Sequence, residues 1–208
     1  SCMAAGAMAS PFPVLAQQGF LATPRQPEGP FYPLRLPDDQ DNDLVRVKGE
    51  PGFAKGEIAH LSGRVLDANA RPLHGVRVEI WQCDANGHYH HPQDRIAKDR
   101  DPNFQGFGHF VTGPDGGYAF RTIKPVPYPG RTPHIHFKLK STDFPEFVTQ
   151  MYIAGHPGNA VDGLLARVPQ GSRRSSLMVN FLPIRAPSNA TEFTARFDIV
   201  LGVTPNQA

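Results

Sequence analysis

The sequence predicts an all-β protein, an antiparallel β-sandwich preceded by an extended N-terminal arm. The 208 residues include 20 Gly and 22 Pro, and these residues mark turns between short strands rather than helix interiors. Several apolar segments alternate with polar residues at the two-residue period of a strand with one buried face. No long stretch has the periodicity of an amphipathic helix. The length suits a single domain with an arm.

The chain opens with an uncharged segment, residues 1–17 (SCMAAGAMASPFPVLAQ). One interpretation is the remnant of an export signal, which would place the protein in the periplasm or outside the cell. The other is an apolar arm that packs on a partner subunit of a cytoplasmic protein. No run in the sequence reaches the roughly 20 apolar residues that span a bilayer. We therefore expect no membrane span.

Residues 18–55 are expected to form a Pro-rich arm. Four prolines lie within residues 26–43 (QPEGPFYPLRLPDDQDND). Proline lacks a backbone N–H and fixes φ, which opposes both helix and central strand. The remaining residues, 56–208, are expected to form the β-sandwich domain.

Short apolar segments separated by turns predict the strands. Val76, Val78 and Ile80 show the alternation most clearly, and Tyr118 and Phe120 share a strand face that should fill the core. We expect strands at residues 58–66, 76–82, 108–112, 117–122, 134–140, 147–153 and 191–201. The first two should form a hairpin around residues 67–72. Trp81 is expected between the sheets, and residues 160–167 are the best candidate for a short helix.

The dispersed charge points to a small-molecule partner, and the cysteines point to a reduced protein. The net charge is +2, with Lys and Arg dispersed along the chain, so the basic patch that captures nucleic acid is not predicted. Of the two cysteines, Cys83 follows an apolar run and is interpreted as a buried reduced thiol. A disulfide with Cys2 is the alternative.

The clearest candidate for chemistry is HIHF, residues 134–137. On a strand, His134 and His136 point to the same face and can offer two imidazoles to one metal, although such a pair can also arise by chance on a surface. Tyr89 (in GHYHHPQD) and Tyr128 (in KPVPYPGRTPHIH) lie in turn-rich segments. A tyrosine there ordinarily covers apolar surface with its hydroxyl in water.

Together the four side chains favour a trivalent metal. Phenolate oxygens are hard and anionic, so with two imidazoles they suit iron(III) better than a soft metal. Two phenolates and a hydroxide would also balance the charge of the ion in a partly buried site. The sequence therefore predicts long loops that carry a metal site.

From Glu28 to Leu201 the sequence resembles the intradiol ring-cleavage dioxygenases, especially the protocatechuate 3,4-dioxygenase type. The motifs that carry the resemblance occur in order along the chain. They are GPFYP (29–33), DNDLVR (41–46), GRVLDANARPL (63–73), VEIWQ (78–82), DPNFQGFG (101–108), DGGYAFRTIKPVPYP (115–129), HIHF (134–137), TQMYI (149–153) and FDIVL (197–201).

The resemblance implies a non-haem iron(III) site. Tyr128 and His134 would be its axial ligands, and Tyr89 and His136 its equatorial ligands. Arg131 matches the active-site arginine of the family, and Gln150 matches a glutamine that supports the site. Only five residues separate Tyr128 from His134, where relatives usually carry a longer loop. A loop this short can displace Tyr128 from the axial position and change the shape of the pocket wall.

The resemblance also implies the reaction. A catechol such as protocatechuate would bind iron(III) as a dianion, and Tyr128 and a bound hydroxide would leave the metal as they take up its two protons. Dioxygen would attack a ring carbon, Arg131 would stabilise the negative charge on the ring, and a cis,cis-muconate would form. The identity of the catechol stays open. A homo-oligomer is expected, and a second type of subunit is an alternative.

Two other interpretations keep the fold and change the function. GRVLDANARPLHGVRVEIW followed by DGGYAF also resembles transthyretin-like sandwiches that only bind sugars or mediate adhesion, since a fold does not decide a function. Alternatively, the His134/His136 pair and the loop with His88, His90 and His91 could hold copper or zinc. That histidine-rich loop could also contact an acidic group of a substrate.

Overall fold

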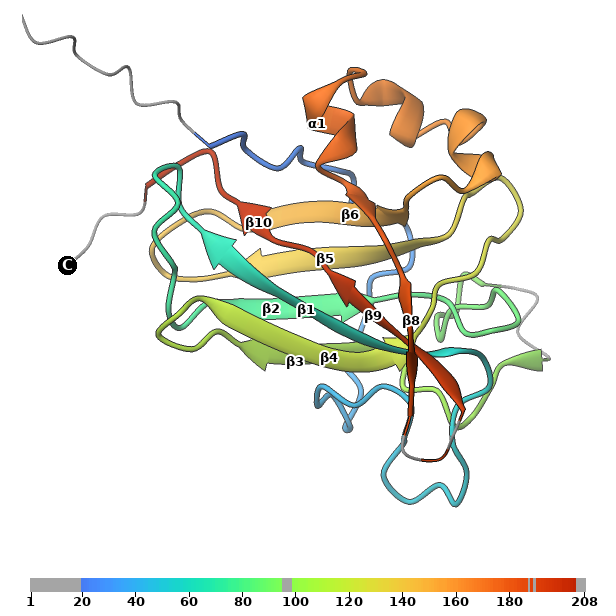
Figure 1. The fold of residues 1–208 in the computed structure, drawn as a ribbon. Helices are drawn as coiled ribbons and strands as arrows, with labels where there is room; N and C mark the ends of the chain where they lie inside the picture. The colour runs from blue at the N-terminus through green and yellow to red at the C-terminus, as the bar shows by residue number, and fades with distance from the viewer. Residues whose placement is uncertain (1–19, 95–98, 187, 189, 205–208) are drawn as a thin grey trace, which may run out of the picture.

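The computed structural model describes residues 20–94, 99–186, 188 and 190–204, and it confirms the β-sandwich (Figure 1). Cys83 is a free, buried thiol, and burial raises its pKa to about 12. Residues 1–17, including Cys2, lie outside the described residues, so the predictions for this segment stay predictions. Among the described residues, no helix has the length and hydropathy to cross a bilayer.

The two layers are five-stranded sheets of mixed direction. One sheet has the order β10 (Ile199–Val200), β1 (Ile58–Leu66), β9 (Thr191–Arg196) and β8 (Leu182–Arg185), with β4 (Gly117–Ile123) also paired to β1. The other has the order β3 (Phe107–Val111), β2 (Arg77–Trp81), β5 (His134–Lys140), β6 (Phe147–Ile153) and β7 (Met178–Val179). Most pairs are antiparallel, as predicted, but β9 and β10 run parallel to β1, and β7 runs parallel to β6.

The core lies between the sheets and follows the two-residue alternation. In β1 buried and exposed residues alternate along most of the strand, because one face packs inward and the other meets water. Tyr118 and Phe120 of β4 belong to this core, as predicted. The Tyr118 hydroxyl donates to the carbonyl of Phe197, so this polar group is satisfied although it is buried.

Four sequence-based predictions are wrong, each because of a long-range partner or a local side-chain bond. The strands 58–66 and 76–82 form no hairpin, since β1 and β2 belong to different sheets. The single strand 191–201 is divided into β9 and β10 where Phe197 and Asp198 interrupt the pairing with β1. Trp81 packs with Phe107 and Tyr89 in a second cluster, apart from the core between the sheets.

The helix expected at residues 160–167 is also absent. Two 3-10 turns, η2 (Pro157–Ala160) and η3 (Leu165–Arg167), flank a turn instead. The Asp162 carboxylate accepts from the backbone N–H groups of Leu164 and Leu165 at 3.0 and 2.9 Å. Such local bonds compete with a regular helix. One short helix, α1 (Ser172–Ser175), and the strands β7 and β8 were not predicted.

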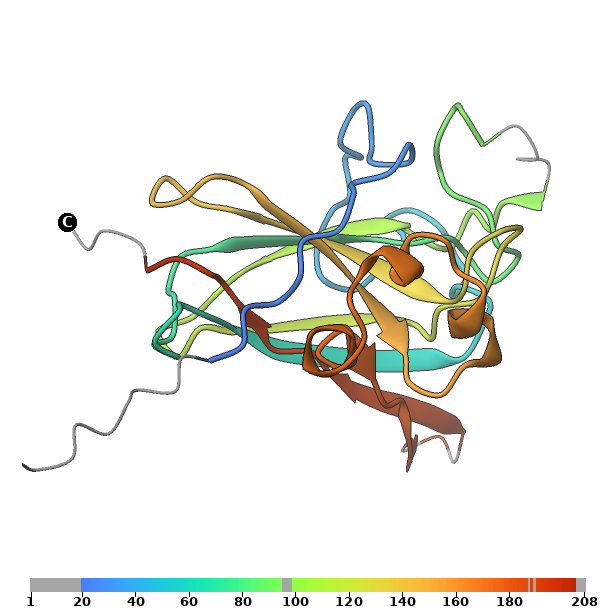
Figure 2. The same ribbon diagram turned by 90° about the horizontal axis from the view of Figure 1, so that it is seen from above.

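The N-terminal arm crosses the outer face of the sheet that contains β5 (Figure 2). Residues 20–57 form no helix or strand beyond an isolated bridge at Asp43. Their hydrogen bonds go to the sandwich: the N–H of Gln26 donates to the carbonyl of Val148 at 3.0 Å, and the Tyr32 hydroxyl donates to Glu79 at 2.8 Å. The arm therefore places residues 29–32 over the middle of the sheet.

Candidate metal centre

Strand β5 supplies two imidazoles to one face. His134 and His136 are 1% and 2% exposed, and their Nε2 atoms lie 3.2 Å apart. Their spacing follows from the pleat, which brings residues two apart to the same side. The neighbouring strands hold β5 from both sides, because Trp81 of β2 and Gln150 of β6 are the register partners of His136.

The protonation of His134 is set by its own backbone. Its Nδ1 lies 2.6 Å from the carbonyl oxygen of Thr132, so Nδ1 carries the proton and donates it to that carbonyl. The lone pair of Nε2 is then free for a metal. His136 stacks on the Trp81 indole, with 4.7 Å between ring centroids and 12° between planes. Both rings are fixed before any ligand binds.

Tyr89 reaches the histidines from the connection after β2. Its hydroxyl oxygen lies 3.4 Å from His134 Nε2, and the side chain is buried. Two carboxylates shape this connection: Asp84 accepts from the N–H groups of Asn86 and His88 at 2.9 and 3.0 Å, and Asp94 accepts from the Tyr89 N–H at 2.7 Å. Phe31 of the arm stacks on the Tyr89 ring at 4.5 Å.

Tyr128 stands on a tight turn that explains how the short loop still reaches the site. The Arg131 N–H donates to the Tyr128 carbonyl at 2.9 Å, and Gly130 has a φ of +82°. Pro129 and Gly130 thus occupy the middle of a four-residue turn whose third residue needs a positive φ. The Tyr128 ring centroid lies 5.6 Å from that of Tyr89 and 5.5 Å from that of His134.

Arg131 is fixed beside the Tyr128 hydroxyl. Its Nη1 lies 3.5 Å from that hydroxyl, its Nε donates to Asp162 at 2.9 Å, and its Nη2 donates to Gln150 at 2.7 Å. Gln150 is held in turn by Tyr152, whose hydroxyl donates to Gln150 Oε1 at 3.1 Å. The Gln150 amide also donates to the Pro27 carbonyl of the arm at 2.8 Å. Gln150 therefore connects the guanidinium to the arm.

Burial dominates the electrostatics of this cluster. It lowers the pKa of His134 to about 3, with help from the charge of Arg131, and it holds the pKa of His136 well below its ordinary value. Burial also raises the pKa of Tyr89 and of Tyr128, and the nearby Arg131 opposes the rise at Tyr128. Without a cation, the four groups are neutral imidazoles and phenols at pH 7.

The donor atoms suit one metal ion. Ligands that bind a metal at about 2 Å lie about 3 Å from each other, which agrees with the contacts of His134 Nε2 to His136 and Tyr89. In the described part of the chain, no group of three His, Cys, Asp or Glu residues could hold a metal. The described part of the histidine-rich loop therefore forms no zinc or copper site of that kind, and the tyrosine oxygens are the remaining candidate donors. Oxygen with imidazole fits iron(III).

The three histidines beside Tyr89 have separate surroundings. His91 is 1% exposed and packs its ring edge-on to Phe31 at 5.8 Å. His90 contacts Phe104, and His88 lies 3.7 Å from Asp94. Their expected contact with an acidic substrate group stays a prediction.

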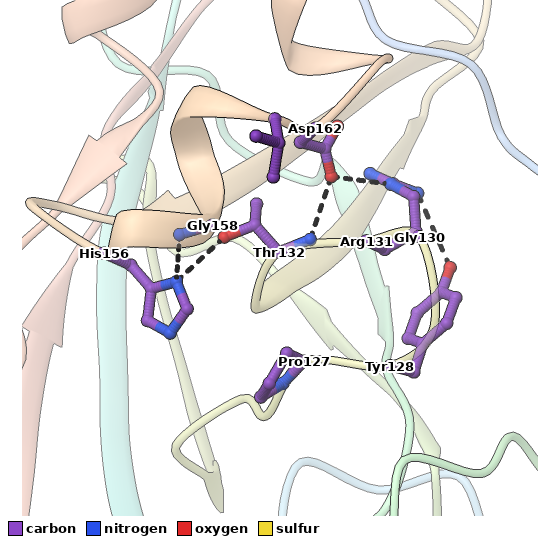
Figure 3. Close-up of a pocket in the computed structure, with 9 residues that line it drawn as sticks. Pro127, Tyr128, Gly130, Arg131, Thr132, His156, Gly158 and Asp162 are labelled. Atoms are coloured by element: carbon purple, nitrogen blue, oxygen red, sulfur yellow. Dashed lines mark hydrogen bonds and ion pairs between the residues drawn. The ribbon is translucent and has the colours of Figure 1, made fainter.

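A cavity of about 180 Å³ opens beside Tyr128 and Arg131. Figure 3 shows Arg131 between the Tyr128 hydroxyl and the Asp162 carboxylate, with His156 on the opposite wall. A Cβ at Gly130 would meet no atom within 4 Å, so the shortened loop leaves this wall open. The cavity borders the cluster at Tyr128 and Arg131.

Sequence reasoning missed three residues of the cluster. Phe31 and Trp81 stack on Tyr89 and His136, and Asp162 holds Arg131. The register of β2 against β5 would have placed Trp81, but that pairing is visible only in the fold. Asp162 had a local signal, because an Asp next to a Gly is typical of a turn in which the carboxylate accepts the backbone N–H two residues on.

Comparisons with known proteins agree with this geometry. A family model described as "Dioxygenase" matches residues 27–202. The chain is 36% identical over 185 residues to a protocatechuate 3,4-dioxygenase beta chain from Burkholderia cepacia, an alignment that covers 85% of this chain and 78% of the relative. A hydroxyquinol 1,2-dioxygenase from Nocardioides simplex is 31% identical over 83% of this chain, which spans 62% of that longer relative.

A solved structure gives the same result. The dioxygenase domain of a dioxygenase–carbohydrate-binding fusion from Streptomyces sp. SirexAA-E superimposes with a TM-score of 0.66 at 32% identity, covering 88% of this chain and 99% of that domain. Motifs, fold and family model agree, and they rule out a purely passive sandwich module. The chain belongs to the intradiol ring-cleavage dioxygenase family and is an oxidoreductase.

Proposed function

We propose that this protein is a non-haem iron(III) dioxygenase that cleaves a catechol-type ring, protocatechuate or catechol, between its two hydroxyl-bearing carbons. Both atoms of dioxygen would enter the product, a cis,cis-muconate. The observation that carries the proposal is the convergence of His134 Nε2 with His136 Nε2 at 3.2 Å and with the Tyr89 hydroxyl at 3.4 Å. The relatives named for protocatechuate, hydroxyquinol and catechol support the substrate class.

Tyr89, Tyr128, His134 and His136 would hold the iron. When bound, iron(III) supplies a Lewis acid that binds the catechol as a dianion and makes its ring reactive towards dioxygen. The two tyrosines would bind as phenolates, which offsets the charge of the ion inside a buried site. This assignment predicts a coloured protein.

Tyr128 is suited to move a proton. It is half-buried and lines the cavity, whereas Tyr89 is buried beneath Phe31. Tyr128 is therefore the tyrosine that a substrate can displace. Because burial raises the pKa of Tyr128, its freed phenolate oxygen would take a proton from a substrate hydroxyl.

Arg131 and Gln150 act on the substrate side. The guanidinium is held by Asp162 and Gln150, so it stays charged and oriented, and a fixed cation stabilises negative charge that develops on a ring beside it. Gln150 touches Arg131 and the arm, and we assign it a positioning role. Replacing Arg131 should lower turnover more than iron content.

The visible spectrum tests the proposal. The iron-loaded protein should show a broad tyrosinate-to-iron band that shifts to longer wavelength when catechol or protocatechuate is added without oxygen. Tyr89→Phe and Tyr128→Phe should weaken the band, while Tyr118→Phe, a core tyrosine, should leave it unchanged. A protein that stays colourless after iron loading, or one filled with zinc or copper, would contradict the assignment.

We also propose that the protein assembles as a homo-oligomer, because one chain supplies all four candidate ligands. Native mass spectrometry of the chain expressed alone tests this. An active assembly of identical chains supports it, and activity that appears only with a second type of chain contradicts it.

A further inference from the structure

A fully buried carboxylate lies on the face of the sheet that carries the candidate metal ligands. Val78 and Ile80 of β2 belong to the core between the sheets. Their neighbours Glu79 and Trp81 therefore point to the outer face, where the Trp81 ring stacks on His136. Glu79 is 0% exposed, and the N-terminal arm, which crosses this face (Figure 2), contacts it there. The proposed chemistry gives this charged group no role.

Three donors hold the Glu79 carboxylate. Arg77 Nε donates to one oxygen at 2.7 Å, and the other oxygen accepts from the Tyr32 hydroxyl at 2.8 Å and lies 3.2 Å from Lys140 Nζ. Burial alone would raise the pKa of Glu79, but the bonds from Arg77 and Tyr32 outweigh it, so the pKa is lowered and the group is charged at pH 7. Burial and the carboxylate raise the pKa of Tyr32, so its hydroxyl keeps the proton. The arm is thus tied to the sheet by a hydrogen bond to a charged group, which is stronger than one between neutral groups.

Two attachments flank the part of the arm that lies over the metal site. On one side, the Gln150 amide donates to the Pro27 carbonyl at 2.8 Å. On the other side, the Tyr32 hydroxyl donates to Glu79. Residues 28–31 lie between these two bonds, so their position over the sheet depends on both.

This segment contacts two of the candidate ligands. Phe31, next to Tyr32 in the chain, stacks on Tyr89 with 4.5 Å between ring centroids and 20° between planes. A Cβ added at Gly29 would lie 3.5 Å from His136 Cε1, so the backbone passes at contact distance from that imidazole. One residue of chain spans only about 3.5 Å, so a shift of Tyr32 would also move Phe31.

We propose that Glu79 is a positioning residue for the metal site, which fixes Phe31 against Tyr89 by binding the hydroxyl of Tyr32. The carboxylate acts through the arm rather than on the substrate. The effect on the metal site rests on the proposed function, whereas the attachment of the arm can be measured in the protein without iron. Tyr32→Phe is the sharpest variant, because it removes the hydroxyl and keeps the ring.

Limited proteolysis of the metal-free protein with trypsin tests the attachment. Trypsin can cut the arm after Arg25 and Arg35, and cleavage of a segment that opens transiently follows the population of the open form. Lys138 lies over the Tyr32 ring and pairs with Glu28, and Tyr32→Phe should keep both contacts and lose only the hydroxyl bond. Cleavage should then be about tenfold faster, the factor that one hydrogen bond to a charged group is worth.

Two further variants separate the attachment from a general loss of stability. Tyr118→Phe also removes a buried tyrosine hydroxyl bond, to the Phe197 carbonyl in the core between the sheets, and its cleavage should stay at the wild-type rate. Glu79→Gln removes the charge, so Tyr32→Phe should accelerate cleavage less in that background than in the wild type, because both changes act on one bond. Melting temperatures check that all variants fold. Equal acceleration in the two backgrounds, or in Tyr118→Phe and Tyr32→Phe, would overturn the proposal.

The visible spectrum of the iron-loaded protein tests the effect on the site. Tyr32→Phe keeps all four candidate ligands and should retain its iron, but its tyrosinate-to-iron band should shift, because Phe31 no longer fixes the Tyr89 ring. Tyr118→Phe should keep the wild-type band. An unshifted band despite faster cleavage would overturn the proposal and leave the proposed function intact. A wild-type protein without the band, with faster cleavage of Tyr32→Phe, would instead contradict the proposed function and support the attachment through Glu79.

Discussion

The four candidate metal ligands come from two unlike regions of the molecule. His134 and His136 stand on β5, which is paired on both sides by β2 and β6. Tyr89 and Tyr128 stand on connections whose shapes depend on a few local hydrogen bonds. The pleat places both histidines on one side of β5, and the Thr132 carbonyl and the Trp81 ring orient their side chains. The positions of the two tyrosines should instead respond to substitutions of residues that do not contact any of the candidate metal-donor atoms.

The largest effect on iron content and turnover is expected from a substitution on β5. His136→Ala removes a donor nitrogen and the partner of the Trp81 ring, so iron content should fall close to zero and turnover by more than about 100-fold, since partners of ligands alone cost 10- to 100-fold. Iron analysis and oxygen uptake measure this. His60→Gln, on β1 away from the site, is the control and should keep its iron. Full iron content in His136→Ala would show that the strand does not supply the ligand.

The next largest effect, on stability and on the visible spectrum, is expected from a substitution in the connection that carries Tyr89. Asp84 is fully buried and accepts from the N–H groups of Asn86, His88 and Asp101. Asp84→Ala leaves these donors without their acceptor, which should lower the free energy of unfolding by about 3 kcal/mol or more. The charge-transfer band should weaken although no donor atom has changed. Asp84→Asn retains one acceptor oxygen, so its free energy of unfolding and its charge-transfer band should decrease less than in Asp84→Ala. Equal losses in the two variants would argue against this role of the carboxylate.

A smaller effect is expected at the turn that carries Tyr128. Gly130→Ala should cost about 1–2 kcal/mol of backbone strain, because φ is +82° and the added Cβ meets no atom. Gly49→Ala is a matched control, with φ of +92° and equally open space. Chemical denaturation should show similar losses for both, and only Gly130→Ala should alter the visible spectrum. A spectral change in both variants would mean that strain acts globally.

The smallest effect on the visible spectrum is expected at Asp162, which touches neither tyrosine. Its burial raises the pKa, but the N–H groups of Leu165 and Thr132 and the Arg131 guanidinium outweigh this, so the pKa is lowered. A lowered carboxyl pKa stabilises the fold above the ordinary value of about 4, and this stabilisation is lost as pH falls below it. The stability gap between wild type and Asp162→Asn should therefore narrow below about pH 4. Asp115→Asn, on an exposed turn, is the control for the pH series, and a constant gap would contradict the linkage.

The same contrast explains what could be predicted from the sequence. Strands β1, β5 and β6 were predicted with their observed bounds, because alternation is a local signal. The pairing of β1 with β4 and β9 was not, since residues such as Leu61 and Ala195 are register partners across more than 100 positions. Short strands such as β8, which contains Pro183, lack any clear alternation.

The candidate site residues could be predicted because they lie in motifs that occur in order along the chain. The His134/His136 spacing added a geometric argument, since residues two apart on a strand point to the same face. The Tyr128 turn could also have been predicted, since Pro followed by Gly is typical of a turn that needs a positive φ at its third residue. Stacking of Phe31 on Tyr89 could not, because it depends on where the arm crosses the sheet.

The arm that covers the site is attached by hydrogen bonds to β10, the last strand along the chain. The N–H of Thr23 donates to the carbonyl of Val200, and the N–H of Val200 donates to the Thr23 hydroxyl, both at 2.9 Å. Both anchors thus need β10, which is translated last among the strands, whereas all four candidate ligands precede residue 137. A domain that emerges from the ribosome N-terminus first exposes its histidines and tyrosines before their cover has a final anchor. The outer end of the arm, at Thr23, is in this way the last part of the arm to be secured, after the bonds of Gln26 and Tyr32 to β6 and β2.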